Sequence, residues 1–202
     1  MAMCNHYQAN LERLAEWADE AGYRATGEQD VSPDIWPKRP ATVARIDGGA
    51  KILDTMIWGV PLTMPGKRPG TTVTKHVTNV RNLSSPFWKS RLANPERRCL
   101  VPFTRFAEPK PGKDAETGRP AEHWFTIANR PVAAFAGIWC PSAAGNVFAF
   151  LTCEPNPSVA PLHPKAMPVV LGEDDYDGWL MGDFVAACAL AVPFPSQLMS
   201  IR

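Results

Sequence analysis

Proline occurs 21 times in the 202 residues of this chain, about twice its ordinary frequency. Because proline lacks a backbone donor and clashes with the preceding helical turn, this frequency favours turns and short strands over long helices. The chain is 45% hydrophobic and holds seven tryptophans, which is enough for a substantial core. The length fits one large domain or two small ones. We expect a single domain spanning 1–202, since no repeat or linker divides the chain.

Local patterns predict many short elements. Asn10 can cap a helix over 10–21 that Gly22 ends, and Asp47-Gly48-Gly49 is a hairpin signal between strands at 41–46 and 50–60. Further strands are predicted at 71–77, 98–103, 124–128, 132–139, 147–153 and 167–171, and short helices at 84–93, 174–181 and 183–190. Residues 109–122 are predicted to be a polar loop. We therefore expect an α+β fold whose antiparallel sheets curl into a barrel-like core with a few short helices.

Charge and cysteine usage restrict the classes of partner. The net charge is +1, so any nucleic-acid site must be a local patch. The five cysteines are odd in number and widely spaced, which argues against a disulfide framework or a zinc site. We find no signal peptide and no apolar run of about 18 residues. These features predict a soluble, cytoplasmic monomer with no membrane association, metal or cofactor.

Cys4 is the first residue with notable chemistry. We interpret the preceding Met1-Ala2-Met3 as a leader or a cloning scar. If it is removed, Cys4 carries an α-amine and a thiol on adjacent carbons, which titrate near about 7.7–8.0 and about 8.5. Such a 1,2-aminothiol attacks an aldehyde through nitrogen to give an imine and then through sulfur to close a thiazolidine. From this stretch alone, Cys4 can equally be one more small apolar residue near a terminus.

Four more side chains are candidates for the same site. Glu108 follows an apolar strand, and partial burial would raise its pKa and let it transfer protons near neutral pH. His163 lies in a rigid Pro-Leu-His-Pro turn. Asn79 and Arg81 lie on the same side of an extended segment, where an amide can orient a nucleophile and a guanidinium can hold a phosphate. Each also has a structural interpretation: a solvated carboxylate, a hydrogen-bonded histidine, a turn amide and a surface arginine.

A basic and aromatic stretch suggests a nucleic-acid groove. Eighteen residues hold two aromatic residues, Phe87 and Trp88, and five basic ones, which are Arg81, Lys89, Arg91, Arg97 and Arg98. The stretch can follow a nucleic-acid backbone with aromatics as stacking surfaces, or it can be a solvated face. A set of cysteine, histidine and carboxylate also suits acyl transfer. The order Cys4, Glu108, His163 does not distinguish acyl transfer from the capture of an aldehyde by Cys4.

Short motifs follow one another in a recognisable order over nearly the whole chain. They are Met3-Cys4, Trp58-Gly59-Val60-Pro61, Asn79-Val80-Arg81, Arg98-Cys99-Leu100-Val101-Pro102 followed by Phe106 and Glu108, Ala136-Gly137-Ile138-Trp139, Leu151-Thr152 with Asn156, and His163 through Met167-Pro168-Val169-Val170-Leu171. Each motif is non-specific alone, but the order and spacing are specific. With them, the chain resembles the SRAP family, the SOS-response-associated peptidases that process abasic sites in DNA.

The resemblance implies a mechanism and a partner. The implied partner is single-stranded DNA with abasic sites, so the protein is expected to associate with the nucleoid when it binds DNA. The N-terminal cysteine of the family, here Cys4, is implied to capture the sugar aldehyde as a thiazolidine crosslink. Glu108 is implied to move protons, His163 to assist sugar opening and Asn79 to hold Cys4. Arg81 is implied to bind a flanking phosphate. We also expect DNA contacts from Trp58, Phe87, Trp88 and Arg98.

Two other functions stay open at this stage. One is a cysteine-dependent peptidase that cuts its own leader or other proteins, and weak strand cleavage by β-elimination could accompany crosslinking. The other is a non-catalytic single-strand binder that ignores the lesion. The sequence departs from the usual family pattern at Asn5-His6, where Gly-Arg is common, and at Leu83, Ala107, Pro109 and Lys165. These departures leave the core chemistry and affect the expected DNA contacts.

Overall fold

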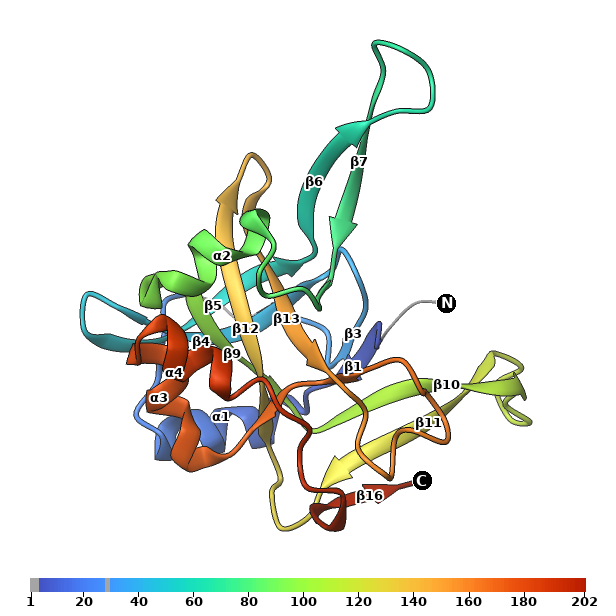
Figure 1. Ribbon diagram of the computed structural model, residues 1–202. Coiled ribbons are helices and arrows are strands. Elements are labelled where there is room, and N and C mark those ends of the chain that lie inside the picture. Colours follow the sequence, from blue (N-terminus) through green and yellow to red (C-terminus); the bar gives the residue numbers. More distant parts are fainter. Residues whose placement is uncertain (1–3, 28–29) are drawn as a thin grey trace.

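The computed structural model describes residues 4–27 and 30–202 (Figure 1). Its centre is a closed barrel of five strands in the order β13-β12-β9-β4-β5, and a parallel pairing of β5 with β13 closes the ring. The α+β fold with antiparallel sheets around a barrel-like core is therefore confirmed. The barrel strands are β4 (Pro40–Asp47), β5 (Ala50–Trp58), β9 (Arg98–Phe103), β12 (Ala133–Ser142) and β13 (Gly145–Cys153).

The barrel strands are apolar because their side chains fill the interior of the barrel. Phe103 stacks on Phe135 with ring centroids 4.0 Å apart, and Phe135 also contacts Phe150 at 4.6 Å. Gly137 admits the neighbouring strand, since a Cβ at this position would lie 2.7 Å from the sulfur of Cys99. Close packing of this kind leaves no room for a larger residue at 137.

A second sheet places the start of the chain between two later strands. Its order is β16-β11-β10-β1-β3, so the short N-terminal strand β1 has a partner on each side (Figure 1). The predicted loop at 109–122 is wrong: β10 and β11 form a hairpin there. A register shift between Pro109 and Lys113 accommodates the prolines that suggested a loop. The strands are β1 (His6–Gln8), β3 (Asp34–Ile35), β10 (Arg105–Lys113), β11 (Pro120–Ile127) and β16 (Met199–Ile201).

A two-stranded hairpin projects from the body. It consists of β6 (Val60–Pro65) and β7 (Thr72–Val77), and it extends well beyond the barrel in Figure 1. Gly59, with a φ of 132°, makes the break between β5 and β6, a conformation that favours glycine. The strand predicted at 50–60 therefore ends at Trp58, and Val60 begins β6, a strand that the sequence pattern does not predict.

The helices are short, as the proline content predicts. In α1 (Leu11–Glu20), the side chain of Asn10 accepts a hydrogen bond from the Arg13 amide, which confirms the expected cap. None of the described helices is long and apolar enough to cross a membrane. The remaining helices are α2 (Pro86–Ala93), α3 (Tyr176–Met181) and α4 (Phe184–Ala189), with 3₁₀ turns η1 (Pro95–Arg97), η2 (Glu173–Asp175) and η3 (Ser196–Leu198). The remaining strands are β2 (Arg24–Ala25), β8 (Asn79–Val80), β14 (Met167–Pro168) and β15 (Val170–Leu171).

Candidate active site

Cys4 lies in the interior, two residues before strand β1. Pairing with β10 and β3 fixes the strand, and the Cys4 side chain is only 1% exposed. Cys4 belongs to the buried hydrophobic cluster on one side, and its thiol donates to the carbonyl of His6 at 3.8 Å. The expected leader, Met1-Ala2-Met3, lies outside the described residues.

Asn79 reaches Cys4 from strand β8. This strand pairs in parallel with β13, which sets Asn79 beside Phe150. The side-chain nitrogen of Asn79 donates to the Cys4 carbonyl at 3.1 Å and to the Thr78 hydroxyl at 2.9 Å. Its side-chain oxygen is buried and has no hydrogen-bond partner in the described part of the chain.

Glu108 is brought to Cys4 by the pairing of β10 with β1. Because His6 lies opposite Ala107 in an antiparallel pair, Glu108 falls next to the residues that precede His6. The carboxyl is fully buried, and burial raises its pKa from 4.5 to about 8. Burial, and then the neighbouring Glu108 carboxyl, raise the pKa of the Cys4 thiol well above its ordinary value. Cys4 is therefore a neutral thiol beside a carboxyl that titrates near neutral pH.

His163 completes the group from a loop that precedes strand β14. Its Nδ1 lies 2.7 Å from the Ala166 carbonyl and 3.7 Å from Oε2 of Glu108, the second distance being longer than a hydrogen bond. Since a carbonyl only accepts, Nδ1 carries a proton and donates it to Ala166. In the neutral imidazole, Nε2 then presents a lone pair, and this atom is buried.

Three side chains from different parts of the sequence thus meet around Cys4. Asn79 Oδ1, both carboxyl oxygens of Glu108 and His163 Nε2 are all buried without a hydrogen-bond partner among the described residues. Buried polar atoms in proteins are nearly always paired with protein or with ordered water, so a cluster of four such atoms is typical of a place where water or a polar ligand binds. The structure therefore brings together the four residues that the sequence suggested for catalysis.

Comparison with known proteins identifies the family. The profile described as "SOS response associated peptidase (SRAP)" matches residues 3–202. The chain belongs to the SRAP family. No curated protein matches this chain.

Solved structures share the SRAP fold of this chain. A protein from Bordetella bronchiseptica has a TM-score of 0.73 at 24% identity, and the match covers 98% of both chains. One from Bacteroides thetaiotaomicron has a TM-score of 0.74 at 14% identity, over 98% of this chain and 90% of that one. A phage-related protein from Bordetella bronchiseptica has a TM-score of 0.64 at 18% identity, over 100% and 93% of the two chains.

Three residues expected to touch DNA are buried instead, and these assignments are corrected. Trp58 is fully buried, where it stacks on Phe150 at 5.1 Å, and Trp88 is 6% exposed. Arg98 is 1% exposed, and its guanidinium donates to three backbone carbonyls. Those carbonyls belong to Leu92, Trp179 and Gly182. Base stacking and phosphate binding need accessible side chains, so these three residues support the fold.

The side chains of Arg81 and Phe87 remain partly accessible to solvent. Arg81 forms an ion pair with Glu154, and both line a surface cavity of about 310 Å³. Phe87 is partly buried, and the guanidinium of Arg91 lies 4.5 Å from its ring centre. Because Glu154 is mostly exposed, an incoming phosphate can compete with it for Arg81.

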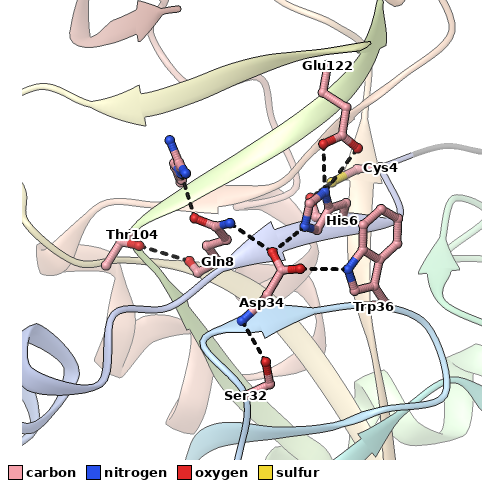
Figure 2. A network of polar contacts seen from close by, with 9 residues as sticks. Cys4, His6, Gln8, Ser32, Asp34, Trp36, Thr104 and Glu122 are labelled. Atoms are coloured by element: carbon pink, nitrogen blue, oxygen red, sulfur yellow. Dashed lines mark hydrogen bonds and ion pairs between the residues drawn. The ribbon is translucent and has the colours of Figure 1, made fainter. Parts of the chain in front are cut away.

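A polar network surrounds His6, and no local sequence pattern predicts it (Figure 2). The two ring nitrogens of His6 contact carboxylates on both sides, Asp34 at 2.7 Å and Glu122 at 2.8 Å. Trp36 stacks on the ring with centroids 3.7 Å apart. Burial raises the pKa of Asp34, but hydrogen bonds from His6, Trp36 and Gln8 outweigh it and leave that pKa below its ordinary value. The network anchors β1 two residues after Cys4, and its partners are too distant in sequence to be recognised.

Among residues 4–27 and 30–202, no group of three or more histidine, cysteine or acidic side chains is arranged to hold a metal ion.

Proposed function

We propose that this SRAP protein captures abasic sites in single-stranded DNA through Cys4, once Cys4 is the first residue, and so protects the lesion during the response to DNA damage. The observation that carries the proposal is the set of unpaired buried atoms of Asn79, Glu108 and His163 around Cys4. A ring-opened abasic sugar offers an aldehyde and hydroxyl groups that suit these atoms.

Sugar opening uses the histidine. The closed abasic sugar is a hemiacetal, which opens when a base removes the proton of the C1′ hydroxyl and O4′ gains one. His163 Nε2 is the free base for this step, because its Nδ1 proton is committed to the Ala166 carbonyl.

Capture uses the carboxyl of Glu108 in both protonation states. The Cys4 amine attacks the aldehyde carbon to give a carbinolamine, and Glu108 protonates the leaving hydroxyl, so that water departs and an iminium forms. The Glu108 carboxylate then takes the thiol proton while sulfur bonds to C1′ and the double-bond electrons return to nitrogen. Amine, thiol and aldehyde become a thiazolidine and one water, and Glu108 regains its proton. A pKa of about 8 suits both transfers near neutral pH.

The state of the thiol supports capture over proteolysis. A cysteine peptidase uses a thiolate, which a neighbouring cation stabilises. Here burial and Glu108 raise the pKa of the Cys4 thiol, in the opposite direction. Nitrogen-first capture needs no thiolate in the ground state, because Glu108 takes the thiol proton only after the iminium has formed.

The test is a denaturing gel with an oligonucleotide that holds one abasic site. A chain that begins at Cys4 should give a shifted band without any reductant, and Cys4→Ala should abolish it. A chain that keeps the three preceding residues has its Cys4 nitrogen in an amide and should give no stable band. If the Cys4-first protein leaves the oligonucleotide unshifted, the proposal is wrong.

A further inference from the structure

The middle of the chain has an uneven charge distribution. The whole chain has 20 acidic residues, about one in ten, yet none falls between residues 55 and 95. The same stretch holds six Lys or Arg residues, which are Lys67, Arg68, Lys75, Arg81, Lys89 and Arg91. The overall charge of +1 therefore hides a local basic region, and the projecting hairpin lies within it.

The β6–β7 hairpin has one face that is apolar and cationic. Leu62 pairs with Lys75 and Met64 with Val73, and side chains of alternate residues share a face. Met64 is 39% exposed and Val73 is 51% exposed. At the root of the same face, Val60 is buried against the body. The apolar face thus begins in the core and continues outwards without a partner in the described part of the chain.

The tip of the hairpin is an ordered turn that carries two further cations. The Thr71 amide donates to the Arg68 carbonyl at 3.1 Å, and the Gly66 amide donates to the Thr71 carbonyl at 2.7 Å. Gly70 has a φ of 76°, as the third residue of a tight turn requires. Lys67 and Arg68 are exposed at this tip.

The root of the hairpin lies beside the candidate active site. Strand β7 ends at Val77, and Asn79, which contacts Cys4, follows two residues later. Two residues of chain span about 7 Å at most, so the hairpin begins within that distance of the Asn79 backbone. The cationic and apolar face therefore starts next to the candidate site and extends away from it along the hairpin.

We propose that the β6–β7 hairpin is an arm that grips the DNA strand flanking the lesion. Phosphates bind Lys67, Arg68 and Lys75, while sugars and bases pack on Met64 and Val73. An isolated two-stranded hairpin is marginally stable and exposes unpaired edges, so a bound strand gives these exposed apolar residues a partner. This inference deepens the proposed function and rests on it for the identity of the strand.

The test measures binding of an undamaged single-stranded oligonucleotide by fluorescence anisotropy over a range of salt concentrations. Lys67→Ala with Arg68→Ala should lower the slope of log K against log salt by about 1.4, at about 0.7 per phosphate contact, which corresponds to about 25-fold weaker binding at 0.1 M salt. The matched control is Lys110→Ala with Lys113→Ala, two exposed lysines on the β10–β11 hairpin. The control should bind within about threefold of the original chain.

Three results would overturn the arm. They are unchanged binding by the Lys67 and Arg68 variant, an equal loss in the control, or a change in self-association by sedimentation without a change in DNA binding. Met64→Ser with Val73→Ser should weaken binding at least threefold with the salt slope unchanged, and binding equal to the original chain would also contradict the proposal.

The experiments distinguish a failure of the arm proposal from a failure of the proposed capture by Cys4. Binding of undamaged DNA needs no chemistry at Cys4, so it tests the arm even if no crosslink forms. With saturating abasic DNA, the arm variant should crosslink at the original rate. If the original chain crosslinks and the variant binds undamaged DNA normally, only the arm is wrong.

Discussion

Glutamine in place of Glu108 should stabilise the fold more and more as pH rises. The buried carboxyl has a pKa of about 8 against an ordinary value of 4.5, and burial is the cause. Between these two pH values the folded chain holds a proton that the unfolded chain releases. The contribution of Glu108 to the free energy of unfolding therefore falls by about 1.4 kcal/mol per pH unit from pH 4.5 upwards, and the fall ends near pH 8.

The size of the effect follows from the same two values. Burial of the Glu108 carboxyl lowers the free energy of unfolding by about 3 kcal/mol at pH 7 and by about 1 kcal/mol at pH 5. Glutamine has the shape of the protonated acid and cannot ionise, so Glu108→Gln removes this cost. For a chain of this size, 1 kcal/mol corresponds to about 2–4 °C, which predicts a rise in Tm of about 6–12 °C at pH 7.

The assay is thermal unfolding of the 202-residue chain and the variant from pH 5 to pH 8, with Glu116→Gln at the exposed tip of the β10–β11 hairpin as control. The Glu108→Gln curve should separate from the original as pH rises, and the control should not. The same variant should crosslink abasic DNA at least about 100-fold more slowly, because an amide transfers no proton. A stability difference that does not depend on pH, or a loss of stability at pH 7, would refute the reasoning.

The remaining predictions concern the stability of the fold and the binding of DNA. Arg98→Ala should lower the free energy of unfolding by about 3–5 kcal/mol, because three buried carbonyl oxygens lose their donor; denaturant unfolding measures this, and a loss under about 1 kcal/mol contradicts it. Arg81→Ala should reduce the salt slope of DNA binding by about 0.7, whereas Glu154→Gln, which frees Arg81, should strengthen binding in the same titration. Equal slopes for the original chain and Arg81→Ala would remove Arg81 from the DNA contacts.

Local signals predicted the elements that depend on neighbouring residues. The helix capped by Asn10 and the strand Arg98–Phe103 are confirmed, since capping and apolar runs act within a few residues. The β10–β11 hairpin was missed because proline and glycine after Glu108 indicate a loop. Their pairing with residues 120–122 depends on a bulge that no local pattern reveals.

The candidate site depended on a different kind of information. Cys4, Asn79, Glu108 and His163 are spread over 160 residues, and only the order of family motifs linked them before the structure brought them together. The burial of Trp58 and Arg98 could not be predicted, because aromatic and basic residues serve equally as DNA contacts or as internal supports. Tertiary packing decides between the two, as the hydrogen bonds of Arg98 illustrate.

The mass of the covalent product tests the central claim most directly. A chain that begins at Cys4, mixed with an abasic oligonucleotide and denatured without reductant, should give one species with the mass of both components less one water. It should resist borohydride, because a thiazolidine has no imine left to reduce, and Cys4→Ala should give none of it. Separate masses for protein and oligonucleotide, or an adduct that also forms with Cys4→Ala, would contradict the account.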